Sequence, residues 1–176
     1  MTISGLKDLK NEILREHSKR QTVAVARWVG HDKKRFRQLM SLFLRGEYRV
    51  TQRSAWIVNQ CLCKCPELAA PWLKQMLSKM QEPGVHNAVP RNVLGSLQYI
   101  PVTKNLLGEL VTVCFNNLLN PATPIAIQAY SMTILLNAAQ QEPDLKHELR
   151  AALEQLLPNG SGGIQARTRI VLKKLG

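Results

Sequence analysis

The sequence contains none of the short motifs that mark common enzyme active sites. Gly-x-Ser-x-Gly, a Walker-type phosphate loop, a glycine-rich dinucleotide fingerprint and a His-x-Glu metal motif are all missing. Histidines are few and scattered, each near an expected helix end: His17, His31, His86 and His147. We therefore do not expect catalysis, a cofactor or a small-molecule substrate.

A signal-peptide core and a long apolar run are also missing. The first seven residues have no apolar core. Residues Leu110–Gln141 carry no charge, but they include four Asn, three Gln and two Pro, and no run approaches the ~20 apolar residues that a bilayer needs. We expect a soluble, cytoplasmic protein without a membrane contact, in which Leu110–Gln141 is a buried helix pair. The alternative is an exposed apolar docking face. A purely structural oligomer, joined through the apolar faces of the terminal repeats, is a further possibility for the chain.

Cysteines number only four, and three of them lie close together at Cys61, Cys63 and Cys65. On a helix, residues 61 and 65 share a face while residue 63 points away, so three thiolates cannot converge on one ion. The fourth, Cys114, supplies no second pair. We expect reduced, buried thiols that act as small apolar side chains, and no metal site.

Acidic residues are scarce relative to basic ones. The chain has 24 Lys and Arg against 12 Asp and Glu, a net charge of +12. Residues 1–60 alone hold 13 basic and 5 acidic residues, a net of +8. This excess predicts an anionic partner near the N-terminal end, either an acidic protein segment or nucleic acid.

The sequence repeats itself at spacings of 38, 38 and 37 residues. Equivalent segments begin at Val50, Ala88, Ala126 and Gly163. Apolar residues recur at spacings of three and four, and no segment alternates with period two. A period near 40 residues with two helices in each is typical of an α-solenoid. We predict one all-α domain over residues 1–176.

Ten helices in five antiparallel pairs are expected from the turn signals. Gly30 should end the second helix, Thr51 should cap the fourth, Pro66 should open the fifth, and Thr123 with Pro124 should start the eighth. The expected helices cover about residues 4–17, 23–30, 31–45, 51–63, 66–80, 85–99, 101–118, 124–140, 143–157 and 164–175.

The paired-helix period, and second helices that begin apolar-Gln-x-x-small-apolar, resemble HEAT or armadillo-type repeats. The glutamine position holds Gln52, Gln128 and Gln165, with Pro90 in the remaining repeat. The resemblance implies an α-α superhelix of about five helix pairs that serves as a non-catalytic binding or scaffold module.

Alkylpurine DNA glycosylases are built from similar helical repeats, and they use an Asp with aromatic neighbours to engage DNA. The loose counterpart in this chain is Trp28 with Asp32, with Trp56 and Tyr48 in reach. A DNA-binding or DNA-repair protein of this kind is therefore the alternative function.

Basic residues on the second helices are the candidate binding residues. Arg53 and Arg91 occupy equivalent positions in the repeat, on the side opposite the apolar core row. Second helices commonly line the concave side of a solenoid, so both should project into one basic groove that binds the acidic segment or nucleic acid. Further contacts are expected from Arg20, Arg27, Lys34 and Arg37.

Overall fold

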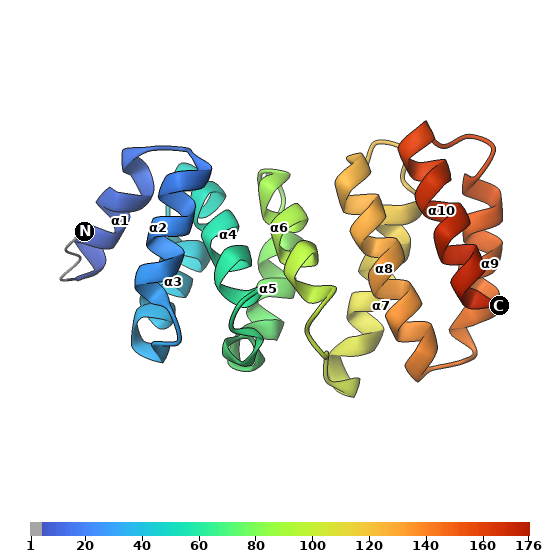
Figure 1. Ribbon diagram of the computed structural model, residues 1–176, viewed down its shortest axis with the longest axis horizontal. Coiled ribbons are helices and arrows are strands. Elements are labelled where there is room, and N and C mark those ends of the chain that lie inside the picture. The colour runs from blue at the N-terminus through green and yellow to red at the C-terminus, as the bar shows by residue number, and fades with distance from the viewer. Residues whose placement is uncertain (1–4) are drawn as a thin grey trace. The chain divides into compact units, whose positions relative to one another are not determined.

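The computed structural model describes residues 5–176, and their secondary structure is helical throughout. Ten α-helices and two short 3-10 turns are present in this part of the chain, with no strand, which confirms the all-α class and the expected number of helices (Figure 1). Contacts divide the chain into an N-terminal unit, up to Ile100, and a C-terminal unit, from Pro101. The assignment of a single domain to residues 1–176 stays a prediction.

The N-terminal unit has two layers of helices. In sequence order its helices are α1 (Leu6–Arg15), α2 (Lys19–Val29), α3 (Lys33–Arg45), α4 (Tyr48–Leu62), the 3-10 turns η1 (Pro66–Leu68) and η2 (Ala70–Trp72), α5 (Leu73–Met80) and α6 (Ala88–Leu97). The first helices of each pair contact one another, α1 with α3 and α3 with α5. The second helices form the other layer, with α4 packed between α2 and α6 (Figure 1).

The C-terminal unit contains two further pairs, α7 (Lys104–Leu119) with α8 (Ile125–Gln141), and α9 (Leu145–Leu156) with α10 (Gly162–Leu175). The helices α7, α9 and α10 all pack against α8. This explains why α8 has no charged residue, because both of its sides are covered along much of its length. The expected buried helix pair at Leu110–Gln141 corresponds to most of α7 and all of α8.

Apolar spacing places the core where the sequence predicts it. On α3 the four residues expected to face inward, Phe36, Leu39, Met40 and Phe43, are all at most 1% exposed. Burying a large apolar side chain stabilises the fold by roughly 1.5–3 kcal/mol. The expected start of the first helix at Ser4 lies outside the described residues.

Several helix ends differ from the expected ones. Gly30 does end α2, with a φ of 51° that glycine adopts without strain. Thr51, however, lies inside α4, which already begins at Tyr48. Thr123 does not cap α8, because Pro124 takes the position before the first helical residue.

The fifth helix begins later than expected. Pro66 opens η1 and Pro71 lies in η2, so α5 starts only at Leu73. Proline has no backbone N–H and clashes with the preceding turn, and two prolines five residues apart prevent a continuous α-helix here. In place of the first turns of an α-helix, this segment forms two tight turns beside α3.

The recurring glutamines have a structural explanation. Gln128 on α8 donates from Nε2 to the carbonyls of Leu118 (3.5 Å) and Asn120 (3.3 Å), at the end of α7. Gln165 on α10 donates to the carbonyl of Gly160 over 3.0 Å. The last carbonyls of α7 lack partners within that helix, and Gln128 from the second helix of the pair supplies a donor, whereas Gly160 lies in the loop between α9 and α10. Gln52 departs from this pattern, since its Nε2 lies 3.1 Å from Nε2 of His86.

Candidate functional site

The exposed cations of α3 form the most distinctive charged feature of the N-terminal unit. Lys33, Lys34 and Arg37 lie within one turn of each other on α3, and all three are exposed. Within the described residues none of the three forms an ion pair. We refer to Lys33, Lys34 and Arg37 as the α3 basic face.

Helix α3 is fixed at its start by Asp32. The Asp32 carboxylate accepts hydrogen bonds from the backbone N–H groups of Lys34 (2.8 Å) and Arg35 (3.0 Å). These bonds, with the backbone of Arg35 contributing most, hold the pKa of Asp32 below its ordinary value. Arg35 itself pairs with Asp32 and lies over the ring of Trp28 at 4.8 Å. Arg35 is therefore engaged within the fold, in contrast to the three cations of the α3 basic face.

A hollow of about 230 Å³ lies between α3 and the two 3-10 turns. Pockets for drug-sized ligands typically enclose about 300–1,000 Å³, so this hollow suits one side chain of a partner better than a small molecule. Its walls combine apolar and charged side chains: Lys33, Phe36, Arg37, Glu67, Leu68, Ala70, Pro71 and Trp72.

Charge in the hollow is positive on balance. Lys33 and Arg37 contribute two cations, and Glu67 contributes one carboxylate. A hydrogen bond from the backbone N–H of Glu67, followed by the bond to His31, lowers the pKa of this carboxyl group, and Lys33 adds a smaller electrostatic effect. Glu67 is thus ionised near neutral pH, and the hollow is lined by both cationic and apolar side chains.

Arg53, whose role in binding stays a prediction, makes hydrogen bonds within the fold. Its Nη1 donates to the carbonyl of Leu14 over 2.7 Å and to that of Ile13 over 3.4 Å. Both carbonyls belong to the last turn of α1. The guanidinium therefore satisfies the C-terminal end of a neighbouring helix, where a positive charge is also favourable.

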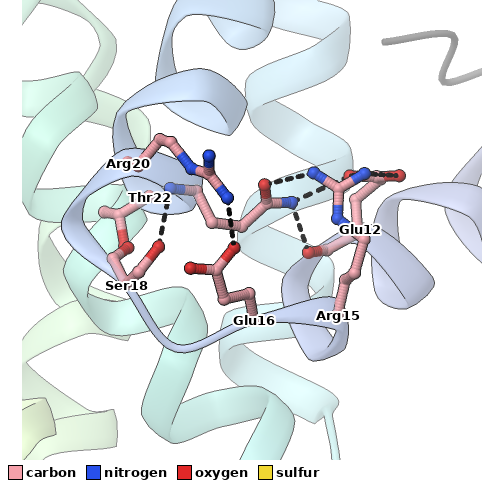
Figure 2. A network of polar contacts seen from close by, with 7 residues as sticks. Glu12, Arg15, Glu16, Ser18, Arg20 and Thr22 are labelled. Atoms are coloured by element: carbon pink, nitrogen blue, oxygen red, sulfur yellow. Dashed lines mark hydrogen bonds and ion pairs between the residues drawn. The ribbon is translucent and has the colours of Figure 1, made fainter.

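Arg91, the repeat equivalent of Arg53, is exposed on α6. Arg20 is exposed on α2 and pairs with Glu16 over 3.2 Å, in the polar network of the α1–α2 turn (Figure 2). In the same network Gln21 donates to the carbonyl of Glu12 over 2.8 Å. Arg27 is exposed on α2.

The six predicted binding residues are therefore divided between the two helix layers. Arg20, Arg27, Arg53 and Arg91 belong to the layer of α2, α4 and α6, whereas Lys34 and Arg37 belong to α3 in the other layer. The apolar part of the hollow was not predicted. The signal in the sequence was the five-residue spacing of Pro66 and Pro71, which indicates that the chain there does not form a continuous helix.

The residues compared with a DNA glycosylase have separate partners. Asp32 caps α3, and Trp28 lies under Arg35. Trp56 packs against the ring of His17, with centroids 5.9 Å apart. Each of these side chains is thus accounted for by a contact within the fold.

The cysteines are free thiols. Cys61, Cys65 and Cys114 are buried as expected, whereas Cys63 is exposed at the end of α4. Burial raises the pKa of Cys61 and of Cys114 to about 12 in each case. Both thiols are therefore protonated at neutral pH and unreactive in the folded chain.

Comparison with known proteins agrees with the helical repeat. A family model described as a HEAT repeat domain matches residues 9–175. No curated protein and no solved structure is similar enough to be identified as a relative. Among the described residues, no helix has the length and apolar character needed to cross a bilayer. With its paired helices in layers and a family match over nearly its whole length, the chain belongs to the HEAT repeat family.

Proposed function

We propose that this chain is a protein-interaction module that binds an acidic segment of a partner protein at the α3 basic face. HEAT repeats typically mediate protein interactions, which supports a scaffold role. An apolar side chain of the segment would enter the hollow between α3 and the 3-10 turns, while flanking carboxylates pair with Lys33 and Arg37.

The observation that carries this proposal is the combination of unpaired cations with an apolar lining. Lys33 and Arg37 line the same hollow as Phe36, Leu68 and Trp72. Surface lysines and arginines increase solubility wherever they lie on the surface. Solubility alone therefore does not explain why two of them lie beside an apolar hollow. Aromatic and aliphatic anchors in such a hollow, surrounded by complementary charge, are typical of protein recognition sites.

Two features favour a protein segment over nucleic acid. Binding to a phosphate backbone relies on many cations along one track. Here Arg20, Arg27 and Arg91 lie in one helix layer and the α3 basic face in the other. In addition, the lining of the hollow includes Phe36, Leu68 and Trp72, which an apolar side chain of a protein segment can contact and a phosphate group cannot.

Fluorescence anisotropy with labelled peptides tests this proposal. One peptide carries leucine between glutamates, a second replaces the leucine with serine, and a labelled DNA duplex provides the nucleic-acid arm. The leucine peptide should bind most tightly, and its affinity should fall as salt increases.

The variant Lys33→Glu/Arg37→Glu should weaken binding of the leucine peptide at least about tenfold, because both contact charges are reversed. The matched control is Lys173→Glu/Lys174→Glu, which makes the same charge change on exposed residues of α10. Equal losses in the two variants would show that only net charge attracts the peptide, and the proposal would then be wrong.

The DNA arm decides the alternative function. Tight duplex binding that survives Lys33→Glu/Arg37→Glu but is lost in Arg20→Glu/Arg27→Glu would place a nucleic acid on the α2 layer instead. In that case, release of a damaged base by the wild-type chain and not by Asp32→Asn would support the glycosylase alternative.

A further inference from the structure

A thiol, an imidazole and a carboxylate meet beside the hollow. His31 lies in the turn between α2 and α3, and Cys65 and Glu67 lie at the start of η1. The Sγ atom of Cys65 is 3.6 Å from Nε2 of His31, and Nδ1 of the same ring is 2.9 Å from Oε1 of Glu67. Among the described residues, this is the group whose ligand atoms approach closely enough to hold a metal ion.

We propose that Cys65 and His31 bind a zinc ion, with Glu67 orienting the imidazole. In a tetrahedral site with Zn–S of about 2.3 Å and Zn–N of about 2.0–2.1 Å, the sulfur and nitrogen ligands are about 3.6 Å apart. The distance between Cys65 Sγ and His31 Nε2 is equal to this ligand separation. The separation of the two atoms therefore suits an ion that is bound by both of them.

Glu67 occupies the position expected of a carboxylate that supports a metal-bound histidine. Such a carboxylate accepts a hydrogen bond from the ring nitrogen that does not bind the metal, which fixes the tautomer and the ring orientation. The contact between Glu67 Oε1 and His31 Nδ1 provides this arrangement and leaves Nε2 of His31 free to bind the ion. The three side chains thus have distinct roles: thiolate ligand, imidazole ligand and orienting carboxylate.

The backbone around the two ligands is held by neighbouring contacts. Gly30 ends α2 directly before His31, and Asp32 caps α3 directly after it. The backbone N–H of Cys65 donates to the carbonyl of Cys61 over 2.8 Å, which extends the helical turn to the thiol. Ligands on anchored turns lose little conformational freedom when they bind an ion.

The ligand types favour zinc over a hard cation. Thiolate and imidazole ligands select zinc and similar metals, whereas calcium and magnesium prefer oxygen. The site is open on one side, because the side chains of His31 and Glu67 are 79% and 55% exposed while Cys65 is only 3% exposed. Two protein ligands would leave two positions of a tetrahedral zinc ion for water, one more than the single open position of a catalytic zinc site.

Titration of the reduced, full-length chain with Co²⁺, followed by displacement with Zn²⁺, tests the proposal. Cobalt bound by a thiolate gives a near-ultraviolet charge-transfer band, and one equivalent of zinc should remove it. Cys63→Ser should keep the band, because this exposed thiol lies outside the cluster. Cys65→Ser should abolish it, and Glu67→Gln should weaken binding about 10–100-fold.

His31→Gln provides an independent arm, because this exposed residue can be replaced without disturbing the core. The variant should lose most of the cobalt band while its circular dichroism spectrum stays unchanged. A band that disappears in Cys63→Ser and persists in Cys65→Ser or His31→Gln would show binding to the exposed thiol alone. That result, or the absence of any band in the wild-type chain, would overturn the assignment. Cys65 and His31 are not among the residues that line the hollow, so their variants test this site separately from peptide binding at the α3 basic face.

Discussion

Replacing Arg53 should destabilise the fold, although sequence comparison places this residue in a binding groove. In the variant Arg53→Met, an unbranched side chain keeps much of the aliphatic contact but removes the guanidinium. The carbonyls of Ile13 and Leu14 at the end of α1 then lose the donor that now lies 3.4 and 2.7 Å away. The contact joins the last turn of α1 to α4, beside the bond from Gln21 to the carbonyl of Glu12.

The size of the effect follows from two contributions. A hydrogen bond from a charged group to a partly buried carbonyl contributes about 1.5–3 kcal/mol. A cation at a helix C-terminus adds about 0.3–1 kcal/mol, part of which is already counted in the hydrogen bond. We expect the free energy of unfolding to fall by about 2 kcal/mol, which corresponds to a decrease in Tm of about 4–8 °C for a chain of this length.

Urea denaturation and thermal melting followed by circular dichroism measure this change. Arg91→Met is the matched control, since Arg91 holds the equivalent repeat position and is exposed on α6. Its free energy of unfolding should stay within about 0.5 kcal/mol of the wild-type value. Both variants should bind the leucine peptide as the wild-type chain does at temperatures where they are folded.

The reasoning would be refuted by the opposite pattern. If Arg53→Met melts as the wild-type chain does but binds the acidic peptide or DNA more weakly, Arg53 is a contact residue and its bonds to α1 contribute little. If Arg53→Met and Arg91→Met are destabilised equally, the loss is a general effect of removing arginine and not a consequence of the contact with α1.

Three further predictions concern packing, capping and pH. Gln128→Leu should lower the free energy of unfolding by about 1–3 kcal/mol in urea titrations, because carbonyls at the end of α7 lose their donor. Gly46→Ala should cost about 1–3 kcal/mol, since the added Cβ would lie 2.3 Å from the carbonyl oxygen of Leu42. Its control, Gly108→Ala on α7, places the Cβ in open space and should stabilise the chain by about 0.5–1 kcal/mol. Burial raises the pKa of Cys114 from the ordinary value of 9.0 to about 12. The contribution of the protonated thiol to the free energy of unfolding is therefore complete below pH 9.0 and is lost between pH 9.0 and about 12. Over that range the wild-type stability should fall more steeply than that of Cys114→Ala, by about 1.4 kcal/mol per pH unit.

The repeat and the core could be predicted from the sequence because they depend on local rules. Helical spacing fixes which side of α3 is apolar, and Phe36, Leu39, Met40 and Phe43 are buried as that spacing requires. Gly30 ends a helix because glycine, which has no Cβ, adopts the positive φ found there without strain. The same holds for the number of helices, since turn signals separate them.

Helix starts were less predictable, because more than one residue near a helix end can supply a hydrogen-bond partner for its unpaired backbone groups. Thr51 carries a hydroxyl suited to capping, yet α4 begins at Tyr48 and the Thr51 hydroxyl instead donates to the carbonyl of Gly46 over 3.1 Å. A side-chain oxygen that serves the end of the preceding helix cannot be distinguished, in sequence, from one that starts the next helix.

The site could not be predicted from the repeat because equivalent positions have unequal neighbours. Arg53 reaches the end of α1, a short helix whose last turn needs donors. Arg91 occupies the same register on α6 but is exposed. Sequence periodicity gives the direction in which a side chain leaves its helix, whereas the distance to a carbonyl on another helix depends on how the layers pack.

Most of the net positive charge of the chain lies in the N-terminal unit, which contains the α3 basic face. Residues 1–100 hold 17 Lys and Arg against 7 Asp and Glu, a net charge of +10, while residues 101–176 hold 7 against 5. Part of this excess is engaged within the fold, as in the Arg20–Glu16 pair and the Arg53 contact with α1. Among the described residues Lys33 and Arg37 form no ion pair, although Lys33 has a small electrostatic effect on Glu67. Cations that form no ion pair among the described residues, beside a hollow with a partly apolar lining, are consistent with the proposed binding of an acidic protein segment.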